Sequence, residues 1–365
     1  MFDPKPQAMA FRSFGLVSET PSPAASGQTI RSSTLRRENG RRMGIVIGMD
    51  EAGYGPNLGP LVITATVWQV PGDPREFDFW SVLADVVSQT RPKKSDERLH
   101  VADSKQVHSP ARGLRDLERS VRPLLNLAGA PLGLFQNLAH WLIGMGESDV
   151  ASSPLVLPNE PWFAEGDLEL PTTLGDEETA ALRERLAETC STTGVRFVAA
   201  RSEVVLTERF NQMTSQYDSK GVALSKTTFG LLGKVWDPDS DEPTLIIGDK
   251  HGGRNRYDDL IDELLDGQMI FRVRESREKS SYRVGASELH FQTGAEAHFP
   301  VAVASMICKY VRELAMEQFN AFWQRHLPDL KPTKGYPVDA KRFRAEIAET
   351  QKRLEIPDDV LWRQR

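Results

Sequence analysis

Two adjacent acidic residues, Asp50 and Glu51, end a short apolar run that begins at Ile45. The run is rich in β-branched residues, which predicts a buried strand, and a turn rich in Gly and Pro follows it. Successive strand residues face opposite sides, so the two carboxylates are offset from one another. The pattern is typical of an ordinary hairpin with two solvated acids. It also fits one corner of a carboxylate site, and that site would need further acids from elsewhere in the chain.

Two such acids follow later in the chain. Asp249 ends a second apolar run at residues 244–248, and Glu313 lies one helical turn after Lys309 in a segment with helical spacing. Clustered carboxylates bind Mg²⁺ or Mn²⁺, and two such ions can contact both the attacking and the leaving oxygen of a phosphodiester. Without a cation the same charges repel one another. The alternative for Glu313 is a surface ion pair with Lys309 of small energetic value.

Four motifs, in sequence order, resemble those of the type-2 ribonucleases H (ribonuclease HII). The first is Asp50-Glu51-Ala52-Gly53-x-Gly55-Pro56, followed by Gly59-Pro60. The others are Asp103-Ser104-Lys105, the acidic strand end at residues 245–249, and residues 303–313 followed by Lys334-Gly335-Tyr336. The resemblance extends from residue 44 to about residue 343.

The resemblance implies a fold and an activity. The fold is α/β, a ribonuclease H-like mixed central sheet flanked by helices. The activity is that of a metal-dependent endonuclease that cleaves RNA in RNA/DNA hybrids, or at ribonucleotides embedded in duplex DNA, leaving 3′-hydroxyl and 5′-phosphate ends. The cofactor is Mg²⁺ or Mn²⁺, with two ions when substrate is bound. The implied catalytic and metal-binding residues are Asp50, Glu51, Asp249 and Glu313.

Two positions depart from the family pattern. Glu313 stands where the family has Asp, and Tyr54 stands where it has Arg. The flanking glycines still allow a close backbone approach, but a charge-assisted phosphate contact is lost. Arg254 is added as a phosphate-binding candidate because a guanidinium makes bidentate contacts. The substrate-binding residues predicted in this way are Gly53, Tyr54, Gly55, Ser104, Lys105, Arg254, Lys309 and Tyr336.

Composition sets the broad limits. The chain has 365 residues, 39% of them hydrophobic, and a formal net charge of −6, which argues against strong nonspecific binding to nucleic acid. Its two cysteines are too few for a disulfide framework, and no apolar stretch is long enough to span a bilayer. We therefore expect a cytoplasmic protein that acts on nucleic acid, with no membrane association and no obligate protein partner.

The chain divides into three predicted parts. Residues 1–42 have the composition of a disordered tail, and the native start is either Met1 or Met43. Residues 43–325 form the catalytic domain, with an insertion at about residues 127–180. Residues 326–365 form a helical extension packed on or near the substrate groove. Within the domain we expect a hairpin, a third strand at residues 195–205, a fourth at residues 245–247, and helical residues 206–236 broken near Gly221.

Two other functions fit the same sequence. The chain could be a divergent member with weak catalysis that binds nucleic acid structurally. It could also be a nuclease of the same fold that cuts a different substrate, such as a DNA junction.

Overall fold

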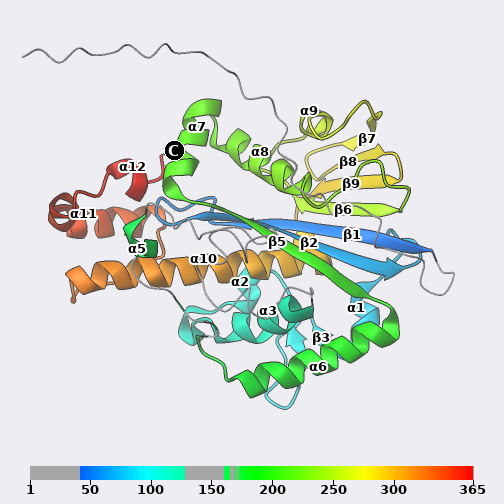
Figure 1. The fold of residues 1–365 in the computed structure, drawn as a ribbon, viewed down its shortest axis with the longest axis horizontal. Helices are drawn as coiled ribbons and strands as arrows, with labels where there is room; N and C mark the ends of the chain where they lie inside the picture. The colour runs from blue at the N-terminus through cyan, green and yellow to red at the C-terminus, as the bar shows by residue number, and fades with distance from the viewer. Residues whose placement is uncertain (1–41, 128–159, 165–167, 169, 171, 365) are drawn as a thin grey trace, which may run out of the picture.

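A mixed sheet forms the centre of the molecule (Figure 1). The computed structural model describes residues 42–127, 160–164, 168, 170 and 172–364. In these residues the sheet has seven strands in the order β5-β2-β1-β6-β9-β8-β7. Their bounds are β1 Met43–Ala52, β2 Leu61–Pro71, β5 Arg196–Val205, β6 Thr244–Asp249, β7 Phe271–Glu275, β8 Lys279–Val284 and β9 Ser287–Gln292. A small parallel pair, β3 (Val87–Ser88) and β4 (Leu99–His100), lies apart from it.

The strand directions give the expected ribonuclease H-like arrangement. β1 pairs antiparallel with β2 and parallel with β6, and β2 pairs antiparallel with β5. β6 pairs parallel with β9, so the C-terminal ends of strands β1, β6 and β9 lie at one edge of the sheet. The predicted hairpin, third strand and fourth strand are confirmed, as is the α/β class.

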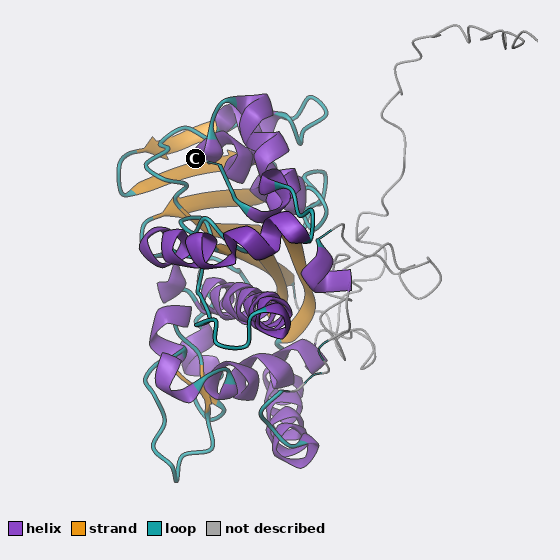
Figure 2. Ribbon diagram, turned by 90° about the vertical axis from the view of Figure 1, so that its left-hand side faces the viewer, coloured by secondary structure: helices purple, strands orange, loops and turns teal. Residues whose placement is uncertain are grey.

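Helices cover both faces of the sheet (Figures 1 and 2). Their bounds are α1 Phe79–Val82, α2 Ser104–Val107, η2 Pro110–Arg112, α3 Arg115–Leu127, α5 Pro161–Ala164, α6 Asp176–Thr193, α7 Thr207–Tyr217, α8 Lys220–Leu232, α9 Asp258–Asp262, η3 Ala295–Ala297, α10 Phe299–His326, α11 Pro337–Arg353 and α12 Asp358–Leu361. The side chains of β1 alternate between the two resulting cores. Val46 packs with α3, α6 and α10, whereas Ile45 and Ile47 pack with α8 and α9.

Helix α10 lies directly against β1 because Gly48 leaves room for it. A Cβ atom on Gly48 would lie 2.3 Å from the carbonyl carbon of Pro300. The helix is buried along most of its length, and its first half contains the small buried residues Ala302 and Ala304. This close approach brings Ser305 and Cys308 of α10 beside Asp50.

The predicted helical region at residues 206–236 breaks in two near Gly221, as expected, and the break itself falls at Asp218 and Ser219. Asp218 ends α7 in the left-handed conformation, with a φ of 47°, and Ser219 then caps α8. Gly221 lies inside α8. Asp is among the few non-glycine residues that adopt this conformation readily.

All but the last residue of the predicted tail (residues 1–42) and most of the predicted insertion lie outside the described residues. The last part of the chain is described. Phe343 of α11 packs against Phe319 and Trp323 of α10, so α11 shares the core of α10. Within the described ranges, no helix is both long and apolar enough to cross a membrane.

Candidate active site

The C-terminal ends of two parallel strands bring three of the four predicted acids together. Asp50 and Glu51 lie at the end of β1, and Asp249 ends the neighbouring strand β6. Adjacent strands are about 4.8 Å apart, so acids at neighbouring strand ends share one surface. Burial, and then the charge of Glu51, raise the pKa of Asp50 well above its usual value. Burial, followed by the charges of Asp249 and Glu296, raises the pKa of Glu51 to about 7.

Asp249 lies in a cradle of backbone N–H groups. Burial raises its pKa, and the N–H groups of Lys250, Ala295 and Gly294 partly offset that rise. Its Oδ1 atom is buried and has no hydrogen-bond partner among the described residues. A buried acceptor without a partner is costly, so this oxygen is available to a cation or a donor that enters the site.

The fourth acid of the cluster is Glu296, which the sequence reasoning missed. Glu296 lies in η3, directly after β9, and its charge raises the pKa values of both Asp50 and Glu51. Burial, and then Asp249 and Asp103, raise its own pKa. Because β9 is the parallel neighbour of β6, an acid just after β9 reaches the same edge of the sheet. The alignment of strand ends was the signal that could have found it.

Glu313 lies in a different environment from these four acids. Its side chain is 1% exposed and forms ion pairs with Lys309 at 2.7 Å and Lys334 at 2.5 Å. Burial by itself would raise its pKa, but the two lysines outweigh burial and lower it to about 2. Ser305, whose side chain contacts the Asp50 carboxylate, lies eight residues before Glu313 in α10, which corresponds to about 12 Å along a helix. The structure therefore joins Glu313 to the lysines and places Glu296 with the other acids.

Ser104 and Lys105 contribute to the site in different ways. The Ser104 side chain is buried and lies 3.2 Å from the hydroxyl of Ser305, which in turn contacts the Asp50 carboxylate. Ser104 thus supports Asp50 from inside the protein and does not lie on the surface as a substrate contact would. The Lys105 side chain is 82% exposed and pairs with Asp103 at 3.7 Å. Its charge opposes the rise in the pKa values of Glu51 and Asp249.

The predicted substrate-binding turn lies beside this cluster. Gly53 has a φ of +91°, and a Cβ atom there would lie 2.4 Å from the carbonyl oxygen of Pro60, so a larger residue is excluded. The Tyr54 ring lies under Lys220, whose Nζ is 4.4 Å from the ring centroid. Gly55 is exposed, with open space around its Cα.

A second turn, which carries Lys334 and Tyr336, packs against the first. The N–H of Asn57 donates to the carbonyl oxygen of Gly335 at 2.8 Å. Arg312 is buried between the two turns and donates to the carbonyl oxygens of Leu58 and Lys334. The Tyr336 ring is 53% exposed. The structure thus gathers Gly53, Tyr54, Gly55, Lys309 and Tyr336 on one side of the acid cluster.

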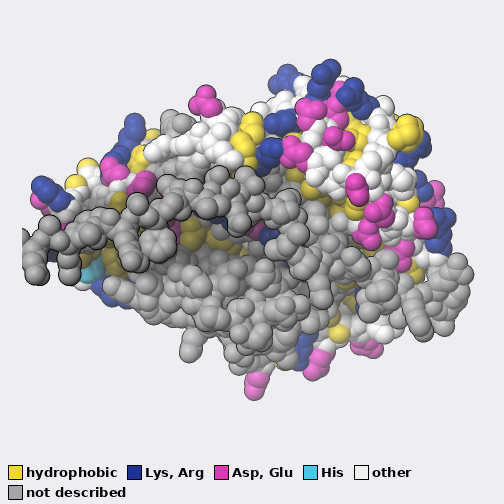
Figure 3. Space-filling view, turned by 45° about the horizontal axis from the view of Figure 1, so that its top comes forward, with side chains coloured by type: hydrophobic (Ala, Val, Ile, Leu, Met, Phe, Trp, Pro, Cys, Tyr) yellow, Lys and Arg dark blue, Asp and Glu magenta, His cyan; other side chains and the backbone are white. Residues whose placement is uncertain are grey.

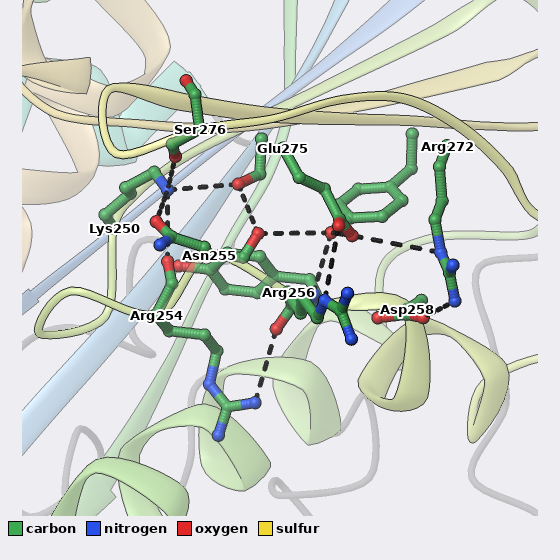
Figure 4. A network of polar contacts seen from close by, with 11 residues as sticks. Lys250, Arg254, Asn255, Arg256, Asp258, Arg272, Glu275 and Ser276 are labelled. Carbon is green, nitrogen blue, oxygen red and sulfur yellow. Dashed lines mark hydrogen bonds and ion pairs between the residues drawn. The ribbon is translucent and has the colours of Figure 1, made fainter.

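Hydrogen bonds from Lys250 hold the loop that carries Arg254 (Figure 4). The ammonium group of Lys250 donates to the carbonyl oxygens of Arg254 and Ser276 and to the side chain of Asn255. The Arg254 side chain points away from this network in Figure 4 and reaches the carbonyl oxygen of Arg256 at 3.4 Å. Its guanidinium therefore remains available to an anion on the side of the loop that faces away from Lys250.

The face shown in Figure 3 is electrically mixed. Toward the end that carries β7 and β8, Lys and Arg side chains are interspersed with Asp and Glu. Arg272 pairs with Asp258, and Arg256 pairs with Glu275, so much of this charge is neutralised locally.

The four clustered acids fit a weakly held divalent cation. Within the described residues, no three His, Cys, Asp or Glu side chains form a group that could hold an ion by themselves. Mg²⁺ commonly takes only one or two protein carboxylates and completes its shell with water and substrate phosphate. The orphaned Oδ1 of Asp249 and the mutual repulsion of the neighbouring acids fit such an ion.

Comparison with solved structures finds similarity to several ribonucleases H. No protein-family model matches the sequence, and no curated protein matches it either. The ribonuclease H2 structure from Pyrococcus horikoshii OT3 aligns with 87% of this chain and 92% of its own, at 15% identity and a TM-score of 0.39. The ribonuclease HII of Archaeoglobus fulgidus, solved in complex with PCNA, aligns with 88% of this chain and 94% of its own, at 14% identity and a TM-score of 0.36. Ribonuclease H3 of Aquifex aeolicus covers 87% of this chain, which spans 70% of that protein, at 12% identity and a TM-score of 0.34.

Proposed function

We propose that the chain is a divalent-metal-dependent endonuclease of the ribonuclease H type. The substrate would be RNA within an RNA/DNA hybrid or a ribonucleotide embedded in duplex DNA, and the products would carry 3′-hydroxyl and 5′-phosphate ends. The observation that supports this most is the convergence of four acids at one sheet edge. Burial and the charges of neighbouring acids raise the pKa values of Asp50, Glu51 and Glu296 there, beside a buried oxygen of Asp249 that has no hydrogen-bond partner among the described residues.

These acids would hold Mg²⁺ or Mn²⁺, with Asp249 Oδ1 as the most available ligand atom. When bound, such ions supply water activation and charge stabilisation of the leaving 3′ oxygen. The remaining steps belong to this chain's own groups. Ser305 fixes the Asp50 carboxylate, and Lys105 supplies a mobile positive charge beside the acids. Glu313 holds Lys309 and Lys334 together on the side of the glycine turn, where a phosphate of the nucleic-acid backbone would lie.

The turn and the exposed aromatic ring would set the substrate class. Single ribonucleotides are distinguished from deoxyribonucleotides by their 2′-hydroxyl, which close backbone N–H groups can contact. The Tyr336 ring is exposed beside the turn and would pack on a sugar or base.

Two buried free cysteines, Cys190 and Cys308, fit action in the reducing cytoplasm.

A cleavage assay tests the proposal. The full chain is incubated with Mg²⁺ or Mn²⁺ and a DNA duplex that carries one ribonucleotide, with an RNA/DNA hybrid and with an all-DNA duplex. Asp50→Asn is the inactive comparison. Asp73→Asn, which changes an acid that pairs with Arg75 far from the cluster, is the matched control. Metal-dependent cleavage of either ribonucleotide-containing duplex, lost in Asp50→Asn alone, is the expected result. Binding without cleavage would favour the structural nucleic-acid binder, and cleavage of all-DNA junctions alone would favour a different substrate.

A further inference from the structure

A buried arginine near the end of the chain contacts the glycine turn. Arg363 follows α12, and its side chain is 1% exposed. Its Nη1 atom donates to the carbonyl oxygens of Gly53 at 2.5 Å and Gly59 at 3.3 Å, and its Nη2 atom donates to that of Tyr54 at 3.3 Å. Its backbone N–H donates to the carbonyl oxygen of Asn57. A residue 310 positions away in sequence thus holds both ends of the turn.

The positive charge of Arg363 is not balanced by an ion pair with any described residue. Its guanidinium lies 3.9 Å above the centroid of the Phe210 ring, and no Asp or Glu of the described residues forms an ion pair with it. Its Nε atom has no hydrogen-bond partner there. Burial, followed by the nearby charge of Arg312, lowers its pKa to about 9. A buried cation held only by carbonyl dipoles and a ring is an expensive way to anchor a chain end, and an apolar residue would do so at lower cost.

The contacts of Arg363 determine where the turn points its N–H groups. In a trans peptide the N–H of one residue points opposite to the carbonyl of the residue before it. With the carbonyls of Gly53 and Tyr54 bound to Arg363, the N–H groups of Tyr54 and Gly55 point away from Arg363. Among the backbone hydrogen bonds of the described residues, none is donated by these two N–H groups. They form a pair of free donors beside the acid cluster.

We propose that Arg363 is a positioning residue that fixes these two N–H groups for an acceptor oxygen of the nucleic-acid backbone. This inference rests on the proposed function, because it assigns a support to the substrate turn of that same site. The acceptor is either a ribose 2′-oxygen or a phosphate oxygen. An all-DNA duplex lacks the 2′-oxygen but has the phosphate oxygens, so the two acceptors can be distinguished.

The C-terminal segment has a second anchor, which makes Arg363 testable. The Asn211 side chain donates to the carbonyl oxygens of Asp359 and Trp362, and accepts from the N–H of Gln364. Arg344 also pairs with Asp358 and lies over the Trp362 ring. We therefore expect the segment to stay attached when the Arg363 side chain is replaced.

The experiment compares the full chain with Arg363→Met, Arg363→Lys and the control Arg344→Gln. The first measurement is backbone hydrogen exchange without substrate. Exchange should accelerate about tenfold in Arg363→Met at the N–H groups of Asn57 and Leu58, which donate to the carbonyl oxygen of Gly335, while the α11 helix keeps its protection. Arg363→Lys keeps the charge but loses the planar fork, so it should loosen the turn as well. Arg344→Gln should leave the turn unchanged. Unchanged exchange at Asn57 and Leu58 in both Arg363 variants would overturn the proposal.

The second measurement is binding and cleavage of the ribonucleotide-containing duplex and of its all-DNA counterpart. In Arg363→Lys, we expect KM for the ribonucleotide duplex to rise about tenfold, with a much smaller change in kcat. If the loss is confined to the ribonucleotide duplex, the acceptor is the 2′-oxygen, and if affinity for the all-DNA duplex falls equally, it is a phosphate oxygen. A loosened turn with unchanged KM and affinity would overturn the recognition role. If the wild-type chain cleaves neither duplex, the proposed function fails, whereas the exchange result still decides whether Arg363 positions the turn.

Discussion

Helix α10 passes two groups of buried or partly buried acids that have opposite electrostatics. At one, Asp50, Glu51, Asp249 and Glu296 lie together, and burial and the charges of neighbouring acids raise the pKa values of Asp50, Glu51 and Glu296. At the other, Glu313 is surrounded by Lys309 and Lys334, and its pKa falls to about 2. Asp50 and Glu313 are both buried, so burial alone does not separate the two groups. The exposed Lys105 only partly offsets the charge of the first group, whereas Glu313 forms ion pairs with two lysines.

This difference indicates a different function for each group of acids. A cluster of like charges with an orphaned oxygen is unfavourable until a cation arrives, which is typical of a metal site. A carboxylate already bound by two lysines gains little from a metal ion, and in the proposed function it would restrain the two lysines for contact with a phosphate. The four predictions that follow test this contrast, from the largest expected effect to the smallest.

Asp50→Asn should abolish cleavage while the fold remains intact. The change removes one negative charge from the crowded cluster at nearly constant volume, so the thermal midpoint should hold or rise. Loss of a required metal ligand should reduce turnover by more than about a hundredfold. Turnover at saturating Mg²⁺ is the measurement, with circular dichroism as the check on folding. A variant that keeps more than about a tenth of wild-type turnover would remove Asp50 from the metal site.

Glu296→Gln and Glu313→Gln should have different consequences if the two groups differ in function. Glu296→Gln should lower kcat by about a hundredfold and raise the Mg²⁺ concentration needed for half-maximal rate. Glu313→Gln should instead weaken duplex binding by about tenfold, because Lys309 and Lys334 lose their common partner.

Metal titrations and binding isotherms for both variants distinguish the two effects. The reverse pattern, with Glu313→Gln altering the Mg²⁺ dependence and Glu296→Gln silent, would restore Glu313 as the fourth metal-binding acid predicted from the motif.

The two groups should also contribute to stability with opposite pH dependence. The pKa of Glu51 is raised from 4.5 to about 7, so the folded state binds the extra proton, and stability is lost as pH rises through about 7. The pKa of Glu313 is lowered from 4.5 to about 2, so its contribution is present above 4.5 and is lost as pH falls toward 2.

Urea unfolding without divalent ions, between about pH 3 and pH 8, measures this contrast. Glu51→Gln should be more stable than the wild-type chain at about pH 8 and equal to it below about pH 4.5. Glu313→Gln should be less stable than wild type near neutral pH, and the deficit should shrink toward about pH 3. Parallel pH profiles for the two variants would show that the acids do not form two electrostatic classes.

The sequence predicted the parts of the site that depend on local pattern. The apolar runs before Asp50 and Asp249 identified β1 and β6, and the glycine turn identified a position where only a small residue fits. The motif resemblance assigned the hairpin, the third strand and the fourth strand of the sheet to segments of the sequence, which periodicity alone does not specify. Glu313 was a reasonable prediction from the motif, yet i,i+4 spacing cannot show whether Lys309 neutralises an acid or merely lies near it.

Other parts of the site depend on tertiary pairing, which no local pattern reports. Glu296 reaches the cluster because β9 pairs parallel with β6, and a single turn after β9 then extends to the same edge. Arg363 is 310 residues from Gly53, and nothing in its immediate sequence indicates that it is buried. The break between α7 and α8 was expected near Gly221 and is found close to it, but the residue that adopts the left-handed conformation is Asp218, which the pattern did not identify.

The smallest effect is expected at Tyr54, which lies at the border of the acid cluster. Its ring lies under Lys220, a cation–π contact worth about 0.5–1 kcal/mol at a partly exposed site. Tyr54→Phe keeps the ring and should leave duplex binding unchanged, whereas Tyr54→Ala should weaken it about two- to fivefold by freeing Lys220. Tyr54→Arg places a second cation beside Lys220 but adds a charge that can reach a phosphate, so its binding should become more salt-dependent by about one released counterion. Binding isotherms at two salt concentrations for the three variants measure both quantities. If Tyr54→Ala binds as tightly as Tyr54→Phe, Lys220 plays no part in holding the duplex, and the basic side of the site is confined to Lys309, Lys334 and Arg254.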